Sequence, residues 1–146
     1  MLPFSPDEAS LRAAFRWNVP DRYNIGVAVC DVWAAREPDR LALLDVDASG
    51  KAERVSFADL RTRSNQLANL IVKSGVKRGE RIAILLPQSR EVAESHIAIY
   101  KAGAVALPLA VLFGVDALLY RLQDAGVTGL ITNSASLQKL KSAKEP

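Results

Sequence analysis

The chain has 146 residues, of which 49% are hydrophobic and 24% are charged, a composition that excludes a disordered chain and suits about one folded domain. Its 19 Lys+Arg residues against 16 Asp+Glu leave a net charge of only +3. The basic residues are scattered and not interleaved with aromatic ones, so we expect no nucleic-acid partner. The single cysteine, Cys30, excludes an internal disulfide and is expected to be a small buried residue in a reducing compartment.

Residues 1–24 are rich in proline, arginine and aromatic side chains and show no long hydrophobic period. They predict an N-terminal arm with a short helix within residues 7–16. The first residues lack the basic and apolar regions of a secretory signal, and no stretch of the sequence approaches 18 apolar residues. We therefore expect a cytoplasmic protein without a membrane partner.

The next segments predict a helix followed by a β-hairpin. Apolar residues at helical spacing within residues 26–36 stop before Pro38, which favours a helix over that range. Two strand-like segments, residues 41–46 and 54–57, flank a turn-forming cluster at residues 47–51. This arrangement is typical of a β-hairpin.

A second helix is expected at residues 57–74, because Ser56 and Asp59 have the spacing of a capping box. In this motif the serine hydroxyl accepts a hydrogen bond from the third helical amide, and the carboxylate accepts one from the serine amide. Gly75 supplies the left-handed conformation that commonly ends a helix.

Three short apolar runs then alternate with helix-length amphipathic segments. The runs predict three parallel strands, near residues 81–86, 104–108 and 129–132. The segments between and after them predict helices near residues 89–102, 115–125 and 134–142, of which the first two cross between neighbouring strands. Ser89 is placed to cap the first of these helices. The expected fold is α/β, a Rossmann-like βαβαβ unit with parallel strands, preceded by the arm, a helix and the hairpin.

The sequence shows no recognisable catalytic or metal-binding site, although parallel sheets bind ligands beyond the carboxyl ends of their strands. It contains no Gly-x-Gly-x-x-Gly turn and no Gly-x-x-x-x-Gly-Lys-Ser/Thr loop. His96 is the only histidine, which excludes a multi-histidine metal site, and no Gly-x-Ser-x-Gly elbow accompanies it. The apolar loop at residues 107–113 fits an acyl or thiol channel and fits a contact with another domain equally well.

The clearest family resemblance is carried by two sequence segments, Gly75-Val-Lys-Arg-Gly-Glu-Arg-Ile-Ala-Ile-Leu-Leu-Pro87 and Ile99-Tyr-Lys-Ala-Gly-Ala-Val-Ala-Leu-Pro-Leu109. Val55-Ser-Phe-Ala-Asp-Leu60, Asn65-Gln-Leu-Ala68 and Leu130-Ile-Thr132 support them. These segments occur in the same order over about residues 25–142 and together resemble the N-terminal part of the adenylate-forming superfamily. That superfamily contains the AMP-binding acyl-CoA synthetases, the luciferases and the adenylation domains of peptide synthetases.

Arg22-Tyr-Asn-Ile-Gly26, Cys30-Asp-Val-Trp33 and Leu112-Phe-Gly114 are most similar to acetyl-CoA synthetase-like and medium-chain acyl-CoA synthetase members. The resemblance implies a ligase that converts a small carboxylic acid and ATP to an acyl-adenylate, from which coenzyme A then displaces AMP. It implies ATP, Mg²⁺ and coenzyme A for the complete enzyme. The family's phosphate-binding loop and catalytic residues lie beyond residue 146, so residues 25–146 are expected to be an incomplete N-terminal part of an AMP-binding domain that binds no cofactor by itself.

Within this chain, the candidate surface for a weak contact with coenzyme A is the apolar loop at Leu112, Phe113 and Gly114, with Lys139 and Lys141 near the nucleotide phosphate. The expected partner is the rest of the ligase domain or a complementary polypeptide. Three hypotheses remain open at this point: a truncated ligase that is inactive alone, one piece of a split ligase, and a non-catalytic Rossmann-like module that binds another protein.

Overall fold

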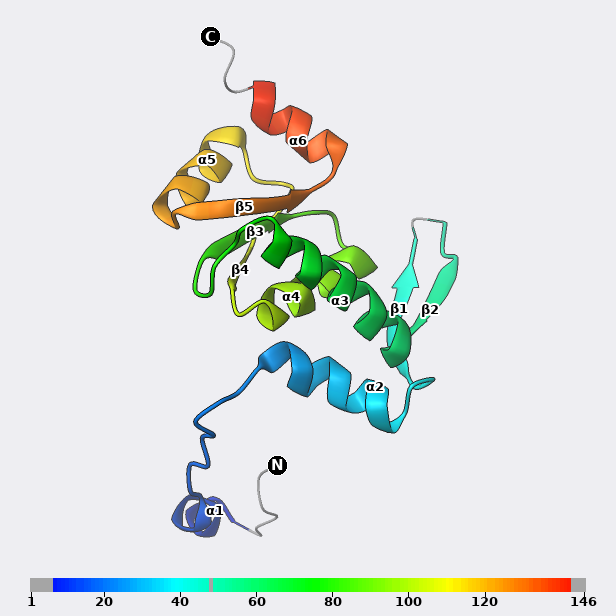
Figure 1. Cartoon of the computed structure of the whole chain (residues 1–146), viewed down its shortest axis with the longest axis vertical. Coiled ribbons are helices and arrows are strands. Elements are labelled where there is room, and N and C mark those ends of the chain that lie inside the picture. Colours follow the sequence, from blue (N-terminus) through cyan, green and yellow to red (C-terminus); the bar gives the residue numbers. More distant parts are fainter. Residues whose placement is uncertain (1–6, 48, 143–146) are drawn as a thin grey trace.

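The parallel sheet predicted from the sequence is present in the computed structural model, which describes residues 7–47 and 49–142. Its strand order is β4-β3-β5, with β3 (Arg81–Leu85) between β4 (Val105–Pro108) and β5 (Val127–Thr132). Both outer strands pair in parallel with β3. The expected α/β fold class is therefore confirmed (Figure 1).

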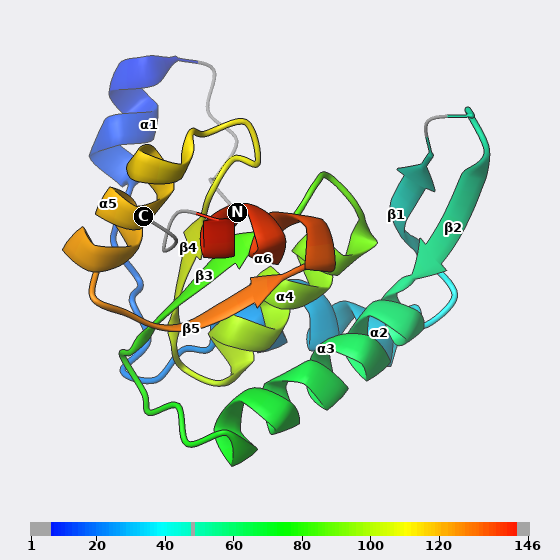
Figure 2. The same cartoon turned by 90° about the horizontal axis from the view of Figure 1, so that it is seen from above.

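The central strand is buried on both faces, as its continuous apolar sequence predicts. Ile82 and Ile84 pack in one cluster with residues of α3 (Phe57–Lys73) and α4 (Arg90–Lys101). Their neighbours Ala83 and Leu85 pack on the opposite side, in a cluster that includes residues of α5 (Val115–Asp124) and α6 (Ser134–Lys141). Figure 1 shows α5 and α6 above the sheet and α3 and α4 below it, and in Figure 2, seen from above, α6 lies in front of the strands.

The strand order corrects one detail of the sequence analysis. Helix α4 connects neighbouring strands as expected, but α5 runs from β4 across β3 to β5. The two crossovers use opposite faces of the sheet, which keeps both of them right-handed. The chain therefore moves from β3 to one side of the sheet, to form β4, and then back past β3 to the other side, to form β5. At such a reversal a crevice between loops is expected beyond the carboxyl ends of the strands, here those of β3 and β5.

The N-terminal part begins with α1 (Glu8–Ala14), none of whose residues is buried. A single π-helical turn, η1 (Val27–Asp31), then leads directly into α2 (Val32–Arg36). The helix expected within residues 26–36 is thus present, with a π turn that its hydrophobic spacing did not reveal. The expected hairpin is formed by β1 (Leu41–Val46) and β2 (Ala52–Ser56), which pair antiparallel.

The capping box at the start of α3 forms as predicted. The amide of Asp59 donates to Ser56 Oγ at 3.1 Å, and the amide of Ser56 donates to Asp59 Oδ2, also at 3.1 Å. The Ser56 hydroxyl also donates to Asp59 Oδ2, at 2.6 Å, and this hydrogen bond, followed by that of the Ser56 amide, lowers the pKa of Asp59. Ser89 occupies the N-cap position of α4, but its side chain makes no capping hydrogen bond, contrary to expectation. Gly75, at φ 90°, ends α3 in the left-handed region.

Candidate functional site

The loop after β4 lies beyond the carboxyl end of that strand and is held by Lys139 of α6. Lys139 Nζ donates hydrogen bonds to the carbonyl oxygens of Val111 at 2.9 Å and Phe113 at 2.6 Å. Leu112, at the tip of the loop, is 91% exposed, and Gly114 is the exposed N-cap residue of α5. The structure therefore brings Lys139 to the loop that the sequence analysis selected.

Arg121 is a second cation at this loop, and the sequence analysis did not identify it. Its guanidinium carbon lies 4.4 Å from the centre of the Phe113 ring, in a cation–π contact. Only its position two helical turns after Gly114 could have indicated from the sequence that Arg121 lies near this loop. Lys141 lies at the exposed end of α6, and among the described residues no hydrogen bond or ion pair joins it to the loop. The arrangement offers an exposed apolar tip beside positive charge.

The apolar loop at residues 107–113 is only partly a surface. Leu109 is 7% exposed and belongs to the core cluster shared by α5 and α6, whereas Leu107 and Phe113 are half-buried against that cluster. Leu112 alone projects strongly into solvent. The loop therefore contributes to the core of this chain while presenting one large apolar side chain at its tip.

A cavity of about 470 Å³ opens at the carboxyl ends of β3 and β5, where the winding of the sheet reverses. Apolar side chains line much of it, including Leu67, Leu86 and Ile131. Glu94 and Thr132 contribute polar atoms, although the Thr132 hydroxyl already donates to the carbonyl of Leu85 at 2.9 Å. Its position agrees with the place where ligands bind to open parallel sheets.

The carboxylates at this cavity have pKa values shifted in opposite directions. Burial raises the pKa of Glu94, whose side chain is only 13% exposed, and the Arg90 guanidinium 3.9 Å away opposes the shift. A hydrogen bond from the Ser89 side chain lowers the pKa of Glu91. Arg90 also pairs with Glu53 of the hairpin at 2.8 Å, so the hairpin is joined to the start of α4.

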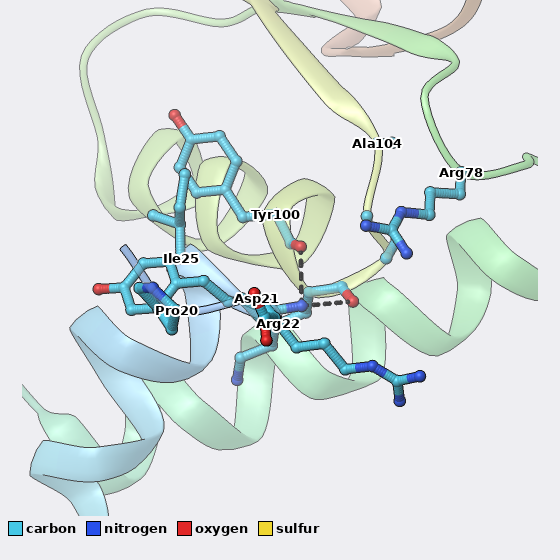
Figure 3. A pocket seen from close by; sticks show the side chains of 12 residues that line it. Pro20, Asp21, Arg22, Ile25, Arg78, Tyr100 and Ala104 are labelled. Carbon is cyan, nitrogen blue, oxygen red and sulfur yellow. Dashed lines mark hydrogen bonds between the residues drawn. The ribbon is translucent and has the colours of Figure 1, made fainter. Parts of the chain in front are cut away.

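A second hollow, a groove of about 1120 Å³, lies near the amino ends of β3 and β4, at the opposite end of the sheet from the cavity described above. It is formed between residues 20–25 of the arm and the last turn of α4 (Figure 3). Tyr100 lines one end of the groove, while the Arg22 and Arg78 side chains lie toward the other end. No residue selected from the sequence as a site candidate lies here.

The arm is joined to the end of α4 by side-chain hydrogen bonds and close packing. Asn24 Nδ2 donates to the carbonyl oxygens of Tyr100 at 3.1 Å and Lys101 at 3.2 Å (Figure 3). Gly26 packs so closely that an added Cβ would lie 2.7 Å from the Ile97 carbonyl oxygen. These contacts place the π turn directly against α4.

The π turn contributes Asp31 to a buried ion pair with Lys101 of α4. Asp31 Oδ1 lies 2.5 Å from Lys101 Nζ, and the lysine side chain is only 7% exposed. The same ammonium group donates to Ser64 Oγ at 2.9 Å and Asn65 Oδ1 at 2.7 Å on α3. Cys30, fully buried as expected, has its pKa raised by burial. The cluster joins three helical segments that are distant in sequence.

The single histidine lies at the edge of the core. His96 is half-buried, its Nδ1 lies 3.2 Å from the Tyr100 hydroxyl, and burial lowers its pKa. Over residues 7–47 and 49–142, no group of three or more His, Cys, Asp or Glu residues is arranged to hold a metal ion. No helix in this described part is long and apolar enough to cross a membrane.

The comparison with solved structures agrees with this geometry. The structure of Brucella canis acyl-CoA synthetase matches with a TM-score of 0.80 and 27% identity, over 94% of this chain and 25% of that chain. A Mycobacterium tuberculosis fatty acyl CoA synthetase matches with a TM-score of 0.71 at 23% identity, which supports the fold alone.

The sequence comparisons lead to the same group of proteins. The human mitochondrial acyl-coenzyme A synthetase ACSM3 is 28% identical over 130 residues, which are 85% of this chain and 22% of that protein. The acetyl-coenzyme A synthetase of Coprinopsis cinerea is 27% identical over 118 residues, 80% of this chain and 18% of that protein. The chain thus spans about a fifth of the length of these relatives. The family model for AMP-binding enzymes matches residues 30–146, and the chain belongs to that family.

Proposed function

We propose that this chain is the N-terminal part of an ATP-dependent acid–CoA ligase. In such an enzyme a carboxylate attacks the α-phosphate of ATP to give an acyl-adenylate and pyrophosphate, and the thiol of coenzyme A then displaces AMP. The observation that carries the proposal is the family match over residues 30–146 together with the TM-score of 0.80 to an acyl-CoA synthetase. The substrate would be a small carboxylic acid.

The chain alone is expected to be inactive. Phosphate binding needs several backbone amides directed at one point, which glycine-rich turns supply, and the eight glycines of this sequence are dispersed with no two adjacent. Loss of one group that stabilises transition-state charge commonly costs about 3 kcal/mol. The ATP-binding and Mg²⁺-binding residues would therefore come from the rest of the ligase domain, or from a complementary polypeptide.

This chain's own contribution to ligand binding is proposed to be a weak contact with coenzyme A. The exposed side chain of Leu112 and the ring of Phe113 would lie along the apolar pantetheine arm, and Gly114 would allow its close approach. Lys141 is exposed and would approach the nucleotide phosphate. Lys139 would act mainly by positioning the loop, because two carbonyl oxygens already accept from its ammonium group.

Two titrations and one activity assay of the purified chain test the proposal. Calorimetric titration with ATP and Mg²⁺, and a pyrophosphate-release assay over short and medium carboxylic acids, should both give no signal. Saturable ATP binding or acid-dependent pyrophosphate release by the chain alone would contradict the expected inactivity. Titration with coenzyme A, followed by NMR, should shift the amide signals of residues 112–114 and 139–141, whereas shifts confined to other residues would refute the proposed contact.

A further inference from the structure

The groove between the arm and the last turn of α4 carries positive charge toward one end and apolar side chains toward the other. Its volume is about 1120 Å³, and residues 20–25, Arg78 and residues 100–104 line it. It lies near the amino ends of β3 and β4, and it shares no residue with the loop at Leu112 or with the cavity beside Glu94. The groove is therefore a separate place where a ligand could bind.

Two arginines extend toward the same end of the groove. Figure 3 shows the side chain of Arg22, from the arm, and that of Arg78, from the loop before β3. Both residues are exposed, and among the described residues no hydrogen bond or ion pair engages either guanidinium group. Their N–H donors are therefore available to a ligand. The planar guanidinium group matches the geometry of carboxylate and phosphate oxygens, which makes these oxygens its preferred partners.

The end of the groove away from the two guanidinium groups is apolar. Figure 3 shows Ile25 and the ring of Tyr100 at that end. Ile25 is 49% exposed and Tyr100 is half-buried, so both keep surface that a ligand could cover. Tyr23, which is 66% exposed, also lines the groove. Aliphatic and aromatic side chains of this kind suit the apolar body of a small molecule.

Contacts between distant segments hold the two walls of the groove in place. The arm wall is fixed by Asn24, whose side chain donates to two carbonyl oxygens at the end of α4 and accepts from the Val27 amide at 3.1 Å. On the other wall, the Gly79 amide donates to the Gly103 carbonyl at 2.9 Å. A Cβ on Gly103 would lie 3.2 Å from Arg78 Cγ, so the arginine stem rests against this backbone. A groove that is formed in advance needs less ordering when a ligand binds.

The carboxyl end of α4 contributes negative partial charge beside the groove, which by itself disfavours an anion. Asn24 offsets this effect, because its amide group donates to the carbonyl oxygens of Tyr100 at 3.1 Å and Lys101 at 3.2 Å. The Gly103 amide donates to the same Tyr100 carbonyl at 3.0 Å. The exposed carbonyl groups of this helix end are thus already engaged by donors of the chain.

The charged side chains of the lining leave an excess of positive charge. Lys101 lines the groove, but its ammonium group is paired with Asp31. Asp21 is the only acidic residue among the lining residues, against the two arginines Arg22 and Arg78. A ligand that carries one or two negative charges is therefore favoured over a neutral or cationic one.

We propose that this groove binds a small amphipathic anion. Its carboxylate or phosphate group would be held by Arg22 and Arg78, and its apolar body would lie against Ile25 and Tyr100. The proposal goes beyond the proposed function and does not depend on it, because the groove lies at the other end of the sheet from the proposed contact with coenzyme A. Carboxylic acids and phosphate monoesters share this chemistry, and separate probes distinguish them.

NMR titration of the purified 146-residue chain is the first test. The probes are 3-phenylpropionate and phenyl phosphate, and the uncharged 3-phenylpropanol is the control. At least one anion should shift the amide signals of residues 21–25 and 102–104 and the Nε–H signals of Arg22 and Arg78 in a saturable way, and the alcohol should bind at least tenfold more weakly. The anion that binds more tightly identifies the head group. No saturable shift with either anion, shifts confined to other residues, or equal binding of the alcohol would overturn the proposal.

Substitution of the arginines tests the charged end of the groove. Arg22→Gln and Arg78→Gln should each weaken binding of the anionic probe at least fivefold. Arg54→Gln, at an exposed position of β2, is the matched control and should leave the affinity unchanged. Thermal unfolding checks that the variants are folded. If Arg78→Gln does not fold because its stem packs on Gly103, the exposed Arg22 decides, and equal affinities of Arg22→Gln and Arg54→Gln would overturn the proposal.

Probes without the ring test the apolar end of the groove. Acetate and inorganic phosphate carry the same head groups as the two anionic probes but have no apolar body. Each should bind at least fivefold more weakly than its phenyl counterpart, because Ile25 and Tyr100 would have nothing to contact. Equal affinities of a probe and its bare head group would overturn the proposal that the ligand is amphipathic.

Discussion

The buried ion pair between Asp31 and Lys101 should be the main link between the N-terminal segment and the body of the chain. Lys101→Met removes the ammonium group while keeping most of the apolar side-chain volume. The carboxylate of Asp31, which is only 26% exposed, is then left without its cation. The hydrogen bonds from Lys101 to Ser64 and Asn65 are also lost.

The expected loss of stability follows from the burial of the pair. Removal of one partner from a buried ion pair typically costs 3–5 kcal/mol, and the partial exposure of Asp31 places this case near about 3 kcal/mol. That is a large fraction of the roughly 5–15 kcal/mol by which domains are stable. With a urea slope of about 2 kcal/mol per molar, the unfolding midpoint of Lys101→Met should fall by about 1.5 M.

Urea unfolding followed by circular dichroism measures this loss, with Lys73→Met at the exposed end of α3 as the matched control. The double variant Asp31→Asn, Lys101→Met should recover part of the loss, because it leaves no unpaired buried charge. A midpoint for Lys101→Met equal to that of Lys73→Met would refute the reasoning. A double variant whose loss equals the sum of the single losses would do so as well.

Three further predictions concern stability. Gly26→Ala should destabilise the chain by about 2 kcal/mol, because the added Cβ would lie 2.7 Å from a carbonyl oxygen. Gly114→Ala should leave the stability unchanged, because the space around Gly114 is open. Thermal unfolding of both variants measures the difference. Ser56→Ala should lower the free energy of unfolding by about 1 kcal/mol, because the capping box is lost. Urea unfolding measures this loss, and an unchanged midpoint would contradict the prediction. Burial raises the pKa of Glu94 in the folded chain above its value in the unfolded chain. The stability of the wild-type chain should therefore fall as the pH rises from the unfolded-state pKa through the folded-state pKa, because the unfolded chain loses its proton first. The melting temperature of Glu94→Gln relative to wild type should accordingly be higher at pH 7 than at pH 4, and a pH-independent difference would contradict this.

The sequence was sufficient to predict most helices and strands, because their signals are local. The buried run in β3, the capping box at Ser56 and the left-handed glycines after α3 and α5 each depend on residues that are close in the chain. The order β4-β3-β5 was not predicted, since it depends on pairing between distant segments that local periodicity does not encode. The π turn at Val27–Asp31 was missed for a related reason, because it packs against α3 and α4, which lie far from it in the sequence.

The candidate site was predictable only in part. The sequence analysis selected the loop at Leu112 and Lys139 as candidates, and these do lie together. The contact of Arg121 with Phe113 and the ion pair between Asp31 and Lys101 join side chains whose distance is set by the tertiary fold. No spacing in the sequence identifies such pairs.

Reconstitution of activity tests the central claim most directly. The purified chain is mixed in equal amounts with the remaining part of the Brucella canis acyl-CoA synthetase, and pyrophosphate release is measured with ATP, Mg²⁺ and a panel of short and medium carboxylic acids. If the chain is the N-terminal part of an acid–CoA ligase, the mixture should release pyrophosphate only when an acid is present, and neither polypeptide should do so alone. Release by the chain alone, or a stable complex that shows no acid-dependent release with any acid of the panel, would contradict the account.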